Sequence, residues 1–309
     1  PMGPDGVATH HHRDFPLDSL LEAKAASGTS VSLVLPARDE EATVAAVVGA
    51  FLPLRDAGLL DEVVVVDSLS GDSTARIAAD AGATVVSVAD VAPEIPARAG
   101  KGEAMWRALH ATTGDVVAYC DTDVLDAGPR FALGLLGPLL TEPDVHLVKG
   151  FYRRPIVDES GAVAEHGGRV TELTARPLLS LARPDLASVV QPLAGEWSGR
   201  RSLLEAIPFP VGYGVEIAGL LDAHRIVGVG GLAQVDLGVR THTHHSQQRL
   251  GVMAAEVLAA ALPRLGLAAP LGREMRQYDA GDHSPLTTPI NADERPPLAS
   301  LRRGPSGRF

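Results

Sequence analysis

The stretch DEVVVVDSLSGDSTARIAADAGATVVSV, residues 61–88, contains the pattern that decides the predicted fold. Its first part is a continuous run of valines, typical of strands that are buried on both faces of a parallel sheet. A polar turn follows, and then a segment with helical spacing. The segment ATVVSV, residues 83–88, has the composition of another strand. The stretch therefore predicts a strand, a crossover helix and a second, parallel strand.

The same alternation continues on both sides of this stretch. VSLVLPA, residues 31–37, predicts a strand, and RDEEATVAAVVGAFLPL after it predicts a helix. GKGEAMWRALHATTG, residues 100–114, predicts a glycine turn and a helix that lead into the strand DVVAYCD, residues 115–121. Strands that alternate with helices of this length indicate parallel βαβ units. We therefore predict a doubly wound α/β unit, in which ligands bind beyond the carboxyl ends of the strands.

Composition and charge narrow the class of protein. A chain of 309 residues can bury a sizeable core, and its formal net charge of −11 argues against a nucleic-acid partner because it repels phosphate backbones. No apolar run reaches the roughly 20 residues that cross a bilayer, and the N-terminal residues lack the plan of a secretory signal. The single cysteine, Cys120, leaves no partner for an internal disulfide. We expect a soluble cytoplasmic protein without a membrane partner.

The second half of the chain is less regular. Strands are predicted at residues 146–155 and 232–242, and the polar segment VDESGAVAEHGG, residues 157–168, predicts a mobile loop. Helices are predicted at residues 169–182, 211–226 and 246–266. From about residue 267 the chain has little periodicity, so we expect a tail that is either draped over the body or disordered.

Acidic residues follow three of the predicted strands. Asp39 and Glu40 come after the first strand, Asp67 ends the second, and Asp121 and Asp123 follow the fourth. Because side chains alternate along a strand, the last two should point to the same side. Two carboxylates that lie so close together repel each other unless a proton or a metal ion compensates their charge. Oxygen ligands favour Mg²⁺ or Mn²⁺. The alternative is a solvated strand end at which an aspartate caps a turn.

The order of these motifs is that of nucleotide-sugar transferases with the GT-A fold. More closely, the sequence resembles the actinobacterial glucosyl-3-phosphoglycerate synthases, a retaining glycosyltransferase family that also contains mannosyl-3-phosphoglycerate synthases. The resemblance runs from about residue 20 to residue 265. It rests on eight motifs in the same order: LPARDEE, GKGEAMWR, DTDV, VHLVKGFYRRP, GGRVTELTARPLL, QPLAGE, PFPVGYGVEI and AQVDLGVRTH.

The resemblance implies an α/β GT-A fold with a Rossmann-like nucleotide-binding sheet and a smaller acceptor-binding lobe. It implies transfer of a hexose to the 2-hydroxyl of 3-phosphoglycerate, with glucose from UDP-glucose as the first candidate. It also implies a homodimer that uses Mg²⁺ or Mn²⁺. The domains implied are an N-terminal extension (1–30), a nucleotide-sugar-binding half (31–150), an acceptor-binding and metal-completing half (151–266) and the C-terminal tail (267–309).

The resemblance also implies roles for single residues. Asp123 and His242 would hold the metal, and Glu216, Asp123 and Lys101 would act in catalysis. Gly168, Arg169 and Thr171 would bind the acceptor. The residues implied for the donor are Pro36, Ala37, Arg38, Glu40, Asp67, Ser68, Lys101, Asp121, Thr122, Tyr213 and Arg240.

Several of these residues also have a simpler interpretation. Glu40 fits the first turn of a helix, where the macrodipole favours an acid. Lys101 and Glu216 could face solvent on their helices, and a lone histidine such as His242 is more often structural than a ligand. Arg169 could be a solvated residue of a first turn, although a helix N-terminus with an arginine is also an anion site.

Besides Thr122, where the family commonly has serine, the chain departs from the family at three positions, and other functions stay open. His245 stands where an arginine is expected, and Ala194 and Trp197 replace the usual glycine and tyrosine. Loss of a permanent cation could redirect substrate binding, so one alternative is the same fold with a different donor or acceptor, for example in secondary metabolism.

A nucleotidyltransferase would need a glycine-rich basic loop after the first strand, where LPARDEE is acidic. A non-catalytic binding protein is disfavoured by the intact candidate site.

Overall fold

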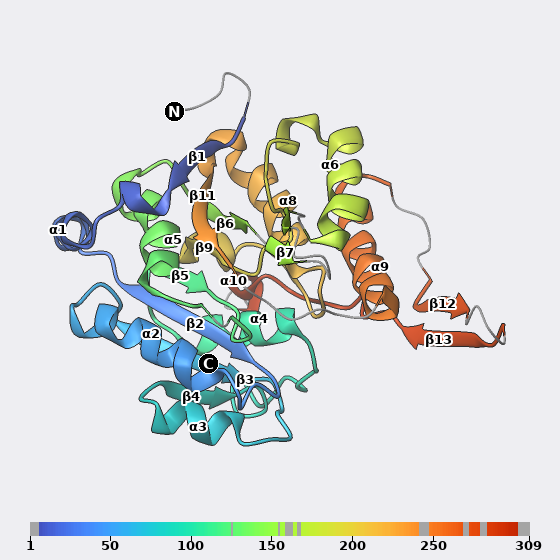
Figure 1. Cartoon of the computed structure of the whole chain (residues 1–309), viewed down its shortest axis with the longest axis horizontal. Helices are drawn as coiled ribbons and strands as arrows, with labels where there is room; N and C mark the ends of the chain where they lie inside the picture. The colour runs from blue at the N-terminus through green and yellow to red at the C-terminus, as the bar shows by residue number, and fades with distance from the viewer. Residues whose placement is uncertain are drawn as a thin grey trace.

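The central feature of the computed structural model is one eight-stranded sheet with helices on both faces (Figure 1). The structure describes residues 6–124, 126–153, 155–157, 163–165, 168–240, 247–267, 272–278 and 283–301. In order across the sheet, the strands are β1 (Ala8–His11), β11 (Leu232–Val239), β6 (Leu147–Arg153), β9 (Trp197–Arg200), β5 (Val116–Tyr119), β2 (Val31–Ala37), β3 (Glu62–Asp67) and β4 (Thr84–Ser87).

The predicted parallel unit is confirmed. β2 pairs in parallel with β3 and with β5, and β3 pairs in parallel with β4. The valine run of β3 is buried on both faces of the sheet: Val64 and Val66 belong to one hydrophobic cluster, and Val63 and Val65 to the other. Burial on both faces explains why this strand is continuously apolar.

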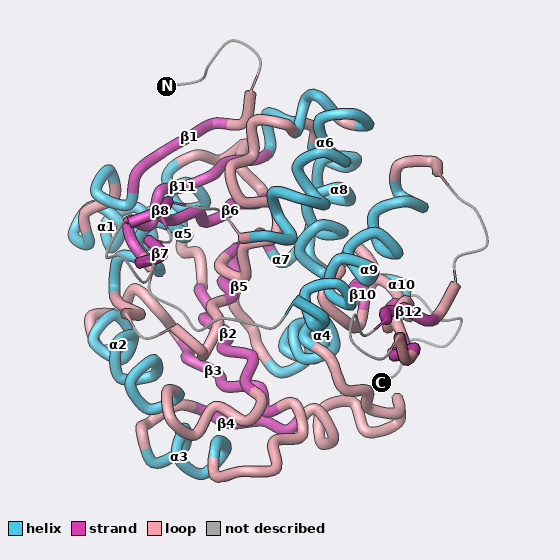
Figure 2. Tube along the Cα trace, turned by 45° about the vertical axis from the view of Figure 1, so that its right-hand side comes forward, coloured by secondary structure: helices cyan, strands magenta, loops and turns pink. Residues whose placement is uncertain are grey.

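Helices cover each face of the sheet and build the two clusters (Figure 2). One cluster includes Trp106 and Trp197, and the other includes Phe51 and Phe131. The first face is covered by α4 (Lys101–Ala111), α7 (Arg201–Leu204), α8 (Val215–Val227) and α9 (Gln247–Arg264). The second face is covered by α1 (Leu17–Ser27), α2 (Val44–Asp56), α3 (Thr74–Asp80) and α5 (Pro129–Thr141).

The sequence prediction lacks two strands of this sheet. β9 runs antiparallel to both β5 and β6, so the sheet is mixed at its centre. β1 adds an edge strand that pairs in parallel with β11. Both strands are only four residues long, and they carry Gly199, Arg200 and two histidines. Their strand state comes from pairing with distant segments, which local periodicity does not report.

The segment after β6 differs in part from the predicted loop. β7 (Pro155–Val157) and β8 (Val163–Glu165) form an antiparallel pair, and the rest of that loop, at 158–162 and 166–167, lies outside the described residues. Helical backbone then begins at Arg169, as predicted, and passes through a π-helical stretch, Thr171–Ala175, into α6 (Arg176–Ala182). Short 3₁₀ turns lie at His12–Asp14, Pro184–Leu186 and Val229–Gly231.

Within the described part of the C-terminal tail, a hairpin projects from the molecule and the segment that follows it lies against the body. A hairpin of β12 (Glu274–Tyr278) and β13 (Pro285–Pro289) projects from the molecule (Figure 1). The chain then returns, and β14 (Glu294–Arg295) pairs with β10 (Phe209–Pro210) just ahead of α8. The last described element is α10 (Leu298–Leu301), whose Leu298 is buried in the cluster with Trp106.

Candidate active site

A cavity of about 900 Å³ opens where β2 and β5 end and α4 begins. The starts of α8 and α9 and the residues ahead of the π-helical stretch complete its wall. It brings together most of the predicted site residues: Pro36, Ala37, Arg38, Glu40, Ser68, Lys101, Asp121, Thr122, Asp123, Gly168, Arg169, Thr171, Tyr213, Glu216 and Arg240. This position, at the carboxyl ends of the strands, is the one that the α/β pattern predicts.

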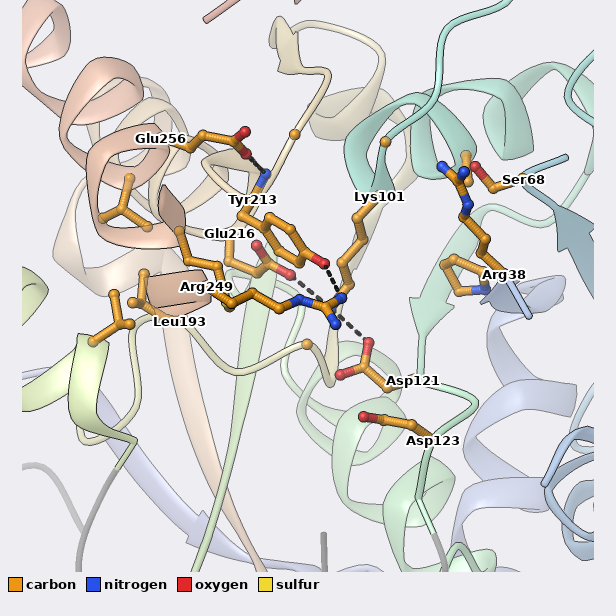
Figure 3. A pocket seen from close by; sticks show the side chains of 18 of the residues that line it. Arg38, Ser68, Lys101, Asp121, Asp123, Leu193, Tyr213, Glu216, Arg249 and Glu256 are labelled. Atoms are coloured by element: carbon orange, nitrogen blue, oxygen red, sulfur yellow. Dashed lines mark hydrogen bonds and ion pairs between the residues drawn. The ribbon is translucent and has the colours of Figure 1, made fainter. Parts of the chain in front are cut away.

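Lys101 joins two walls of the cavity. Its Nζ atom lies 2.6 Å from the carboxylate of Asp121 and 2.8 Å from that of Glu216 (Figure 3). Burial opposes the positive charge, but attraction by these two carboxylates outweighs it and raises the pKa of Lys101 well above its ordinary value. Lys101 therefore stays protonated, and it carries a fixed positive charge at the centre of the site.

The glycines on either side of Lys101 permit close packing of two main chains. A Cβ atom on Gly100 would collide with the carbonyl oxygen of Val211, and one on Gly102 would collide with that of Pro210. The N–H of Glu103 also donates a 3.1 Å hydrogen bond to Val211. The start of α4 is thus pressed against the segment that leads to Tyr213 and Glu216.

Arg240 organises the floor of the cavity around Asp123. Its guanidinium lies 2.8 Å from the Asp123 carboxylate and 3.0 Å from that of Glu196, and it also donates to the Tyr152 hydroxyl. Arg240 and Glu196 are 4% and 1% exposed, whereas Asp123 keeps 37% of its side chain accessible. Burial raises the pKa of Glu196, and Arg240 opposes that change. The buried pair therefore holds Asp123 with its carboxylate still open to the cavity.

The two aspartates of the D-x-D motif lie beyond the strand rather than in it. β5 ends at Tyr119, so strand alternation does not align Asp121 and Asp123, and that part of the argument from sequence was wrong. The positively charged guanidinium of Arg240 aligns them instead, because it approaches both carboxylates. Gly195 fits tightly here, since a Cβ atom on it would collide with the Asp121 carboxylate. Thr122, between them, donates a 3.0 Å hydrogen bond to the carbonyl oxygen of Pro36 at the end of β2.

The loops after β2 and β3 form the far end of the cavity. Glu40 lies ahead of α2 and lines the cavity, so its interpretation as an acid of the helix's first turn is wrong. Burial raises the pKa of Glu40 above its ordinary value, and the charge of Asp123 adds to the shift. Asp67 is buried beneath the lining rather than part of it, and accepts a 3.3 Å hydrogen bond from the N–H of Ser70. Within the described residues, the Ser68 hydroxyl is buried without a hydrogen-bond partner, which suits a site for a polar ligand.

Several lining residues are absent from the sequence prediction. Arg249 donates a 3.2 Å hydrogen bond to the Tyr213 hydroxyl, and Glu256 accepts a 2.8 Å bond from the Tyr213 N–H. Both lie on α9 seven residues apart, a spacing that places them on one face of the helix and was an available signal. Asn291 reaches the cavity from the tail, where no periodicity points to it. Further lining residues outside the prediction include Asp39, Leu193, Gly195 and Met253.

One of the two predicted metal ligands can be located. The Asp123 carboxylate offers oxygen atoms to the cavity, which suits Mg²⁺ or Mn²⁺. His242 and the neighbouring His245 fall in residues 241–246, outside the described residues. Among the described residues, no group of three or more His, Cys, Asp or Glu could hold a metal ion. An ion at Asp123 would need further ligands, and Mg²⁺ commonly takes them from substrate phosphates and water.

The class of the protein follows from the sheet, the cavity at its strand ends and a family match. The model of glycosyl transferase family 2 matches residues 32–166, which include β2 to β6 and the D-x-D motif. The chain is a glycosyltransferase with a GT-A fold. No described helix is long and apolar enough to span a membrane.

Comparison with individual proteins gives the family. The chain is 47% identical over 297 residues to a glucosyl-3-phosphoglycerate synthase of Mycolicibacterium smegmatis, covering 95% of this chain and 97% of that protein. It is 39% identical to one from Petrotoga mobilis, covering 94% and 93%. A crystal structure of the Mycobacterium tuberculosis enzyme with Mn²⁺, UDP-glucose and phosphoglyceric acid matches with a TM-score of 0.86 and 44% identity, over 96% of this chain and 99% of that one. The chain belongs to the glucosyl-3-phosphoglycerate synthase family.

Proposed function

We propose that this protein transfers glucose from UDP-glucose to the 2-hydroxyl of 3-phosphoglycerate with the help of Mg²⁺ or Mn²⁺. The observation that carries the proposal is the cluster of Lys101, Asp121, Asp123 and Glu216, which three separate segments bring to one cavity. Structures of the M. tuberculosis relative contain UDP-glucose with phosphoglyceric acid, or UDP with glucosyl-3-phosphoglycerate, each with Mn²⁺.

The donor would lie along the loops at the ends of β2 and β3. Pro36, Ala37, Arg38 and Glu40 would contact the uracil and ribose, with Ser68 beside the base and Asp67 supporting it from below. Thr122 and Asp121 would face the ribose end of the diphosphate, and Arg240 would balance the negative charge beside Asp123.

The negative charge that develops on the leaving diphosphate is the main obstacle to the reaction. The residues at the centre of the site would stabilise this charge. Asp123 and His242 would hold a divalent cation, which supplies positive charge to the departing diphosphate. Lys101 already has a fixed charge and needs no rearrangement to act in the same way. Preorganised charge of this kind is usually the largest contribution to catalysis.

We propose that the anomeric configuration of glucose is retained. The bond from C1 to the diphosphate breaks, and the acceptor's 2-hydroxyl oxygen forms its bond to C1 on the same face. Its proton passes to the departing phosphate oxygen, so no residue acts as a covalent nucleophile. Tyr213 and Glu216 would contact the sugar, where the buried Glu216 carboxylate, 4% exposed, can stabilise positive charge at C1.

The acceptor would bind where the helical segment begins at residue 169. Gly168, Arg169 and Thr171 line the cavity there, and the N-terminus of a helical segment favours an anion. Arg169 adds a guanidinium, which can bind phosphate or carboxylate through two hydrogen bonds.

Two of the departures from the family are buried and do not line the cavity. Trp197 is 1% exposed and packs against Tyr119 at 4.9 Å between ring centroids, in the core of the sheet. Ala194 is also 1% exposed and lies between Leu193 and Gly195, which do line the cavity. The side chains of Ala194 and Trp197 would therefore not contact a donor or acceptor bound in this cavity.

We also propose a cytoplasmic homodimer. Both substrates are multiply charged and do not cross a bilayer unaided, so the enzyme must meet them where they are made. Leu173 and Leu181, on the helical segment that follows Arg169, are 78% and 87% exposed, and burial of such side chains favours association. Light scattering in solution measures the mass of the particle directly.

A matrix of sugar nucleotides against phosphorylated acids tests the proposed activity. UDP-glucose, other UDP-hexoses and GDP-mannose are each incubated with 3-phosphoglycerate and with related acids, and the products are read by mass. The proposal predicts glucosyl-3-phosphoglycerate and an equal amount of UDP. Another dominant pair would identify a different donor or acceptor, and pyrophosphate release would indicate a nucleotidyltransferase.

A further inference from the structure

A buried ion-pair cluster ties the C-terminal tail to the helix that begins with Lys101. Glu103, two residues after Lys101, is completely buried. The Arg295 guanidinium binds its carboxylate through two hydrogen bonds, of 2.6 Å and 2.8 Å. Arg107, also completely buried, adds a third bond of 2.9 Å. A fork of this kind fixes both the position and the orientation of the carboxylate.

The tail around Arg295 binds α4 in a second way. The indole N–H of Trp106 donates a 2.9 Å hydrogen bond to the carbonyl oxygen of Pro296. The Arg295 guanidinium also lies over the Trp106 ring, 5.5 Å from its centroid. Arg295 is 7% exposed, so these contacts are shielded from water and are stronger than the same contacts at the surface.

The same stretch of tail also holds the opposite wall of the cavity. The N–H of Val211 donates a 2.9 Å hydrogen bond to the carbonyl oxygen of Asp293, and Phe209 pairs with Arg295 in the short β10–β14 ladder. The N–H of Asn291 donates a 3.1 Å bond to Glu256, whose carboxylate also binds the main chain of Tyr213. Residues 291–296, which we call the strap, therefore fasten α4 and the start of α8 to each other.

Lys101, on α4, forms an ion pair with Glu216 on α8 and a second one with Asp121, which follows β5. Its position depends on the separation of α4 and α8, and both the direct packing of α4 against residues 210–211 and the strap contribute to that separation. We propose that Arg295 is a positioning residue for the transfer reaction, and that it acts through Glu103 to hold Lys101 between Asp121 and Glu216. The inference rests on the proposed function, because it assigns Arg295 a part in that reaction.

A double-mutant cycle tests the inference. Arg295→Met removes the fork but keeps most of the side chain's volume, and Arg276→Met is the matched control. Arg276 lies in the same tail, on β12 and outside the strap, is 68% exposed and pairs with Glu274. We expect Arg295→Met to lower kcat by about 10- to 100-fold and Arg276→Met to leave it unchanged, because small misplacements of catalytic groups cost this much. In a Lys101→Met background, Arg295→Met should lower kcat by less than about threefold, because the group that it positions is already absent.

The outcomes separate this inference from the proposed function. If the wild-type enzyme transfers no glucose, the proposed function fails. If it does, and Arg295→Met either matches Arg276→Met or lowers kcat equally with and without Lys101, the positioning role is wrong. Should Arg295→Met fail to fold, Arg295→Lys enters the same cycle. It keeps the charge and loses the fork, so we expect a similar loss of kcat that again disappears in the Lys101→Met background, and a normal rate would overturn the inference.

Discussion

The Asp123 carboxylate accepts a 2.8 Å hydrogen bond from the guanidinium of Arg240, and the two residues follow strands that β6 and β9 separate in the sheet. Asp123 follows β5, and Arg240 follows β11 directly. Because Arg240 is itself held by the buried Glu196, Asp123 keeps one orientation without losing access to the cavity. This relationship gives the partly exposed carboxylate proposed to bind the cation a fixed position at the cavity.

The first prediction concerns Asp123. Asp123→Ala should lower kcat by about 100-fold or more, because it removes the proposed protein ligand of the divalent cation. The melting temperature should change little, since Asp123 is partly exposed and Glu196 still satisfies Arg240. Asp126→Ala is the control: Asp126 is three residues away, pairs with Arg130 and does not line the cavity. Equal rates for the two variants would remove Asp123 from the mechanism.

The second prediction concerns Arg169. Arg169→Ala should raise the KM for 3-phosphoglycerate by roughly tenfold or more, the cost of a lost charge-assisted hydrogen bond, and leave the KM for UDP-glucose nearly unchanged. Steady-state kinetics with each substrate varied in turn measures both values. Arg225→Ala, at a position on α8 that is 64% exposed, controls for a general loss of positive charge. A parallel rise in both KM values would show that Arg169 is not the acceptor's anion site.

The third prediction uses the close approach of Gly195 to Asp121. Gly195→Ala should displace the Asp121 carboxylate from Lys101 and lower kcat by about tenfold or more, since its Cβ has no space. Gly49→Ala is the control, because Gly49 is exposed on α2 with no atom within 4 Å of its added Cβ. It should keep full activity and gain about 0.5–1 kcal/mol of stability. Full activity in Gly195→Ala would mean that the position of Asp121 is unimportant.

The fourth prediction is a pH dependence of stability from Lys149. Lys149 on β6 is 2% exposed, and burial lowers its pKa to about 8. Between about pH 8 and 10.5 the unfolded chain therefore binds more protons at this residue than the folded protein does. Its contribution to the free energy of unfolding should rise with pH across this window, by up to roughly 3 kcal/mol.

Lys149→Met isolates this contribution. Urea denaturation of both proteins from pH 7 to pH 10 measures the two free energies of unfolding. The wild-type value minus the variant value should increase as the pH rises, because the wild type no longer has to bury a charged ammonium group. A difference that stays constant over this range would show that Lys149 titrates normally in the folded protein.

Local sequence patterns predict the part of the fold that is built from local units. The valine run of β3 and the helices on either side carry their own periodicity, so the parallel unit from β2 to β5 follows from the sequence. β9 and β14 do not, because each is short and becomes a strand only by pairing with a distant partner. The tail belongs to the same group, since contacts with residues far away in the sequence anchor it, among them the buried fork between Arg295 and Glu103.

The residues of the site divide in the same way, into those that local motifs predict and those that only distant contacts define. Residues in recognisable motifs, such as Lys101 and Asp123, could be predicted and lie at the cavity. Glu196 could not be assigned, because its importance comes from a contact with Arg240, which is far away in the sequence. The motif GKGEAMWR also contains Glu103, but nothing in the sequence shows that its partner is an arginine 192 residues later.

The most direct test of this account is a crystal of the protein soaked with UDP-glucose and Mn²⁺, examined by anomalous scattering at the manganese edge. We predict one strong peak in the cavity that is bonded to the Asp123 carboxylate and to the donor's diphosphate, with Lys101 against the same diphosphate. A donor bound with no metal peak at Asp123, or with its diphosphate away from Asp123 and Lys101, would contradict the account.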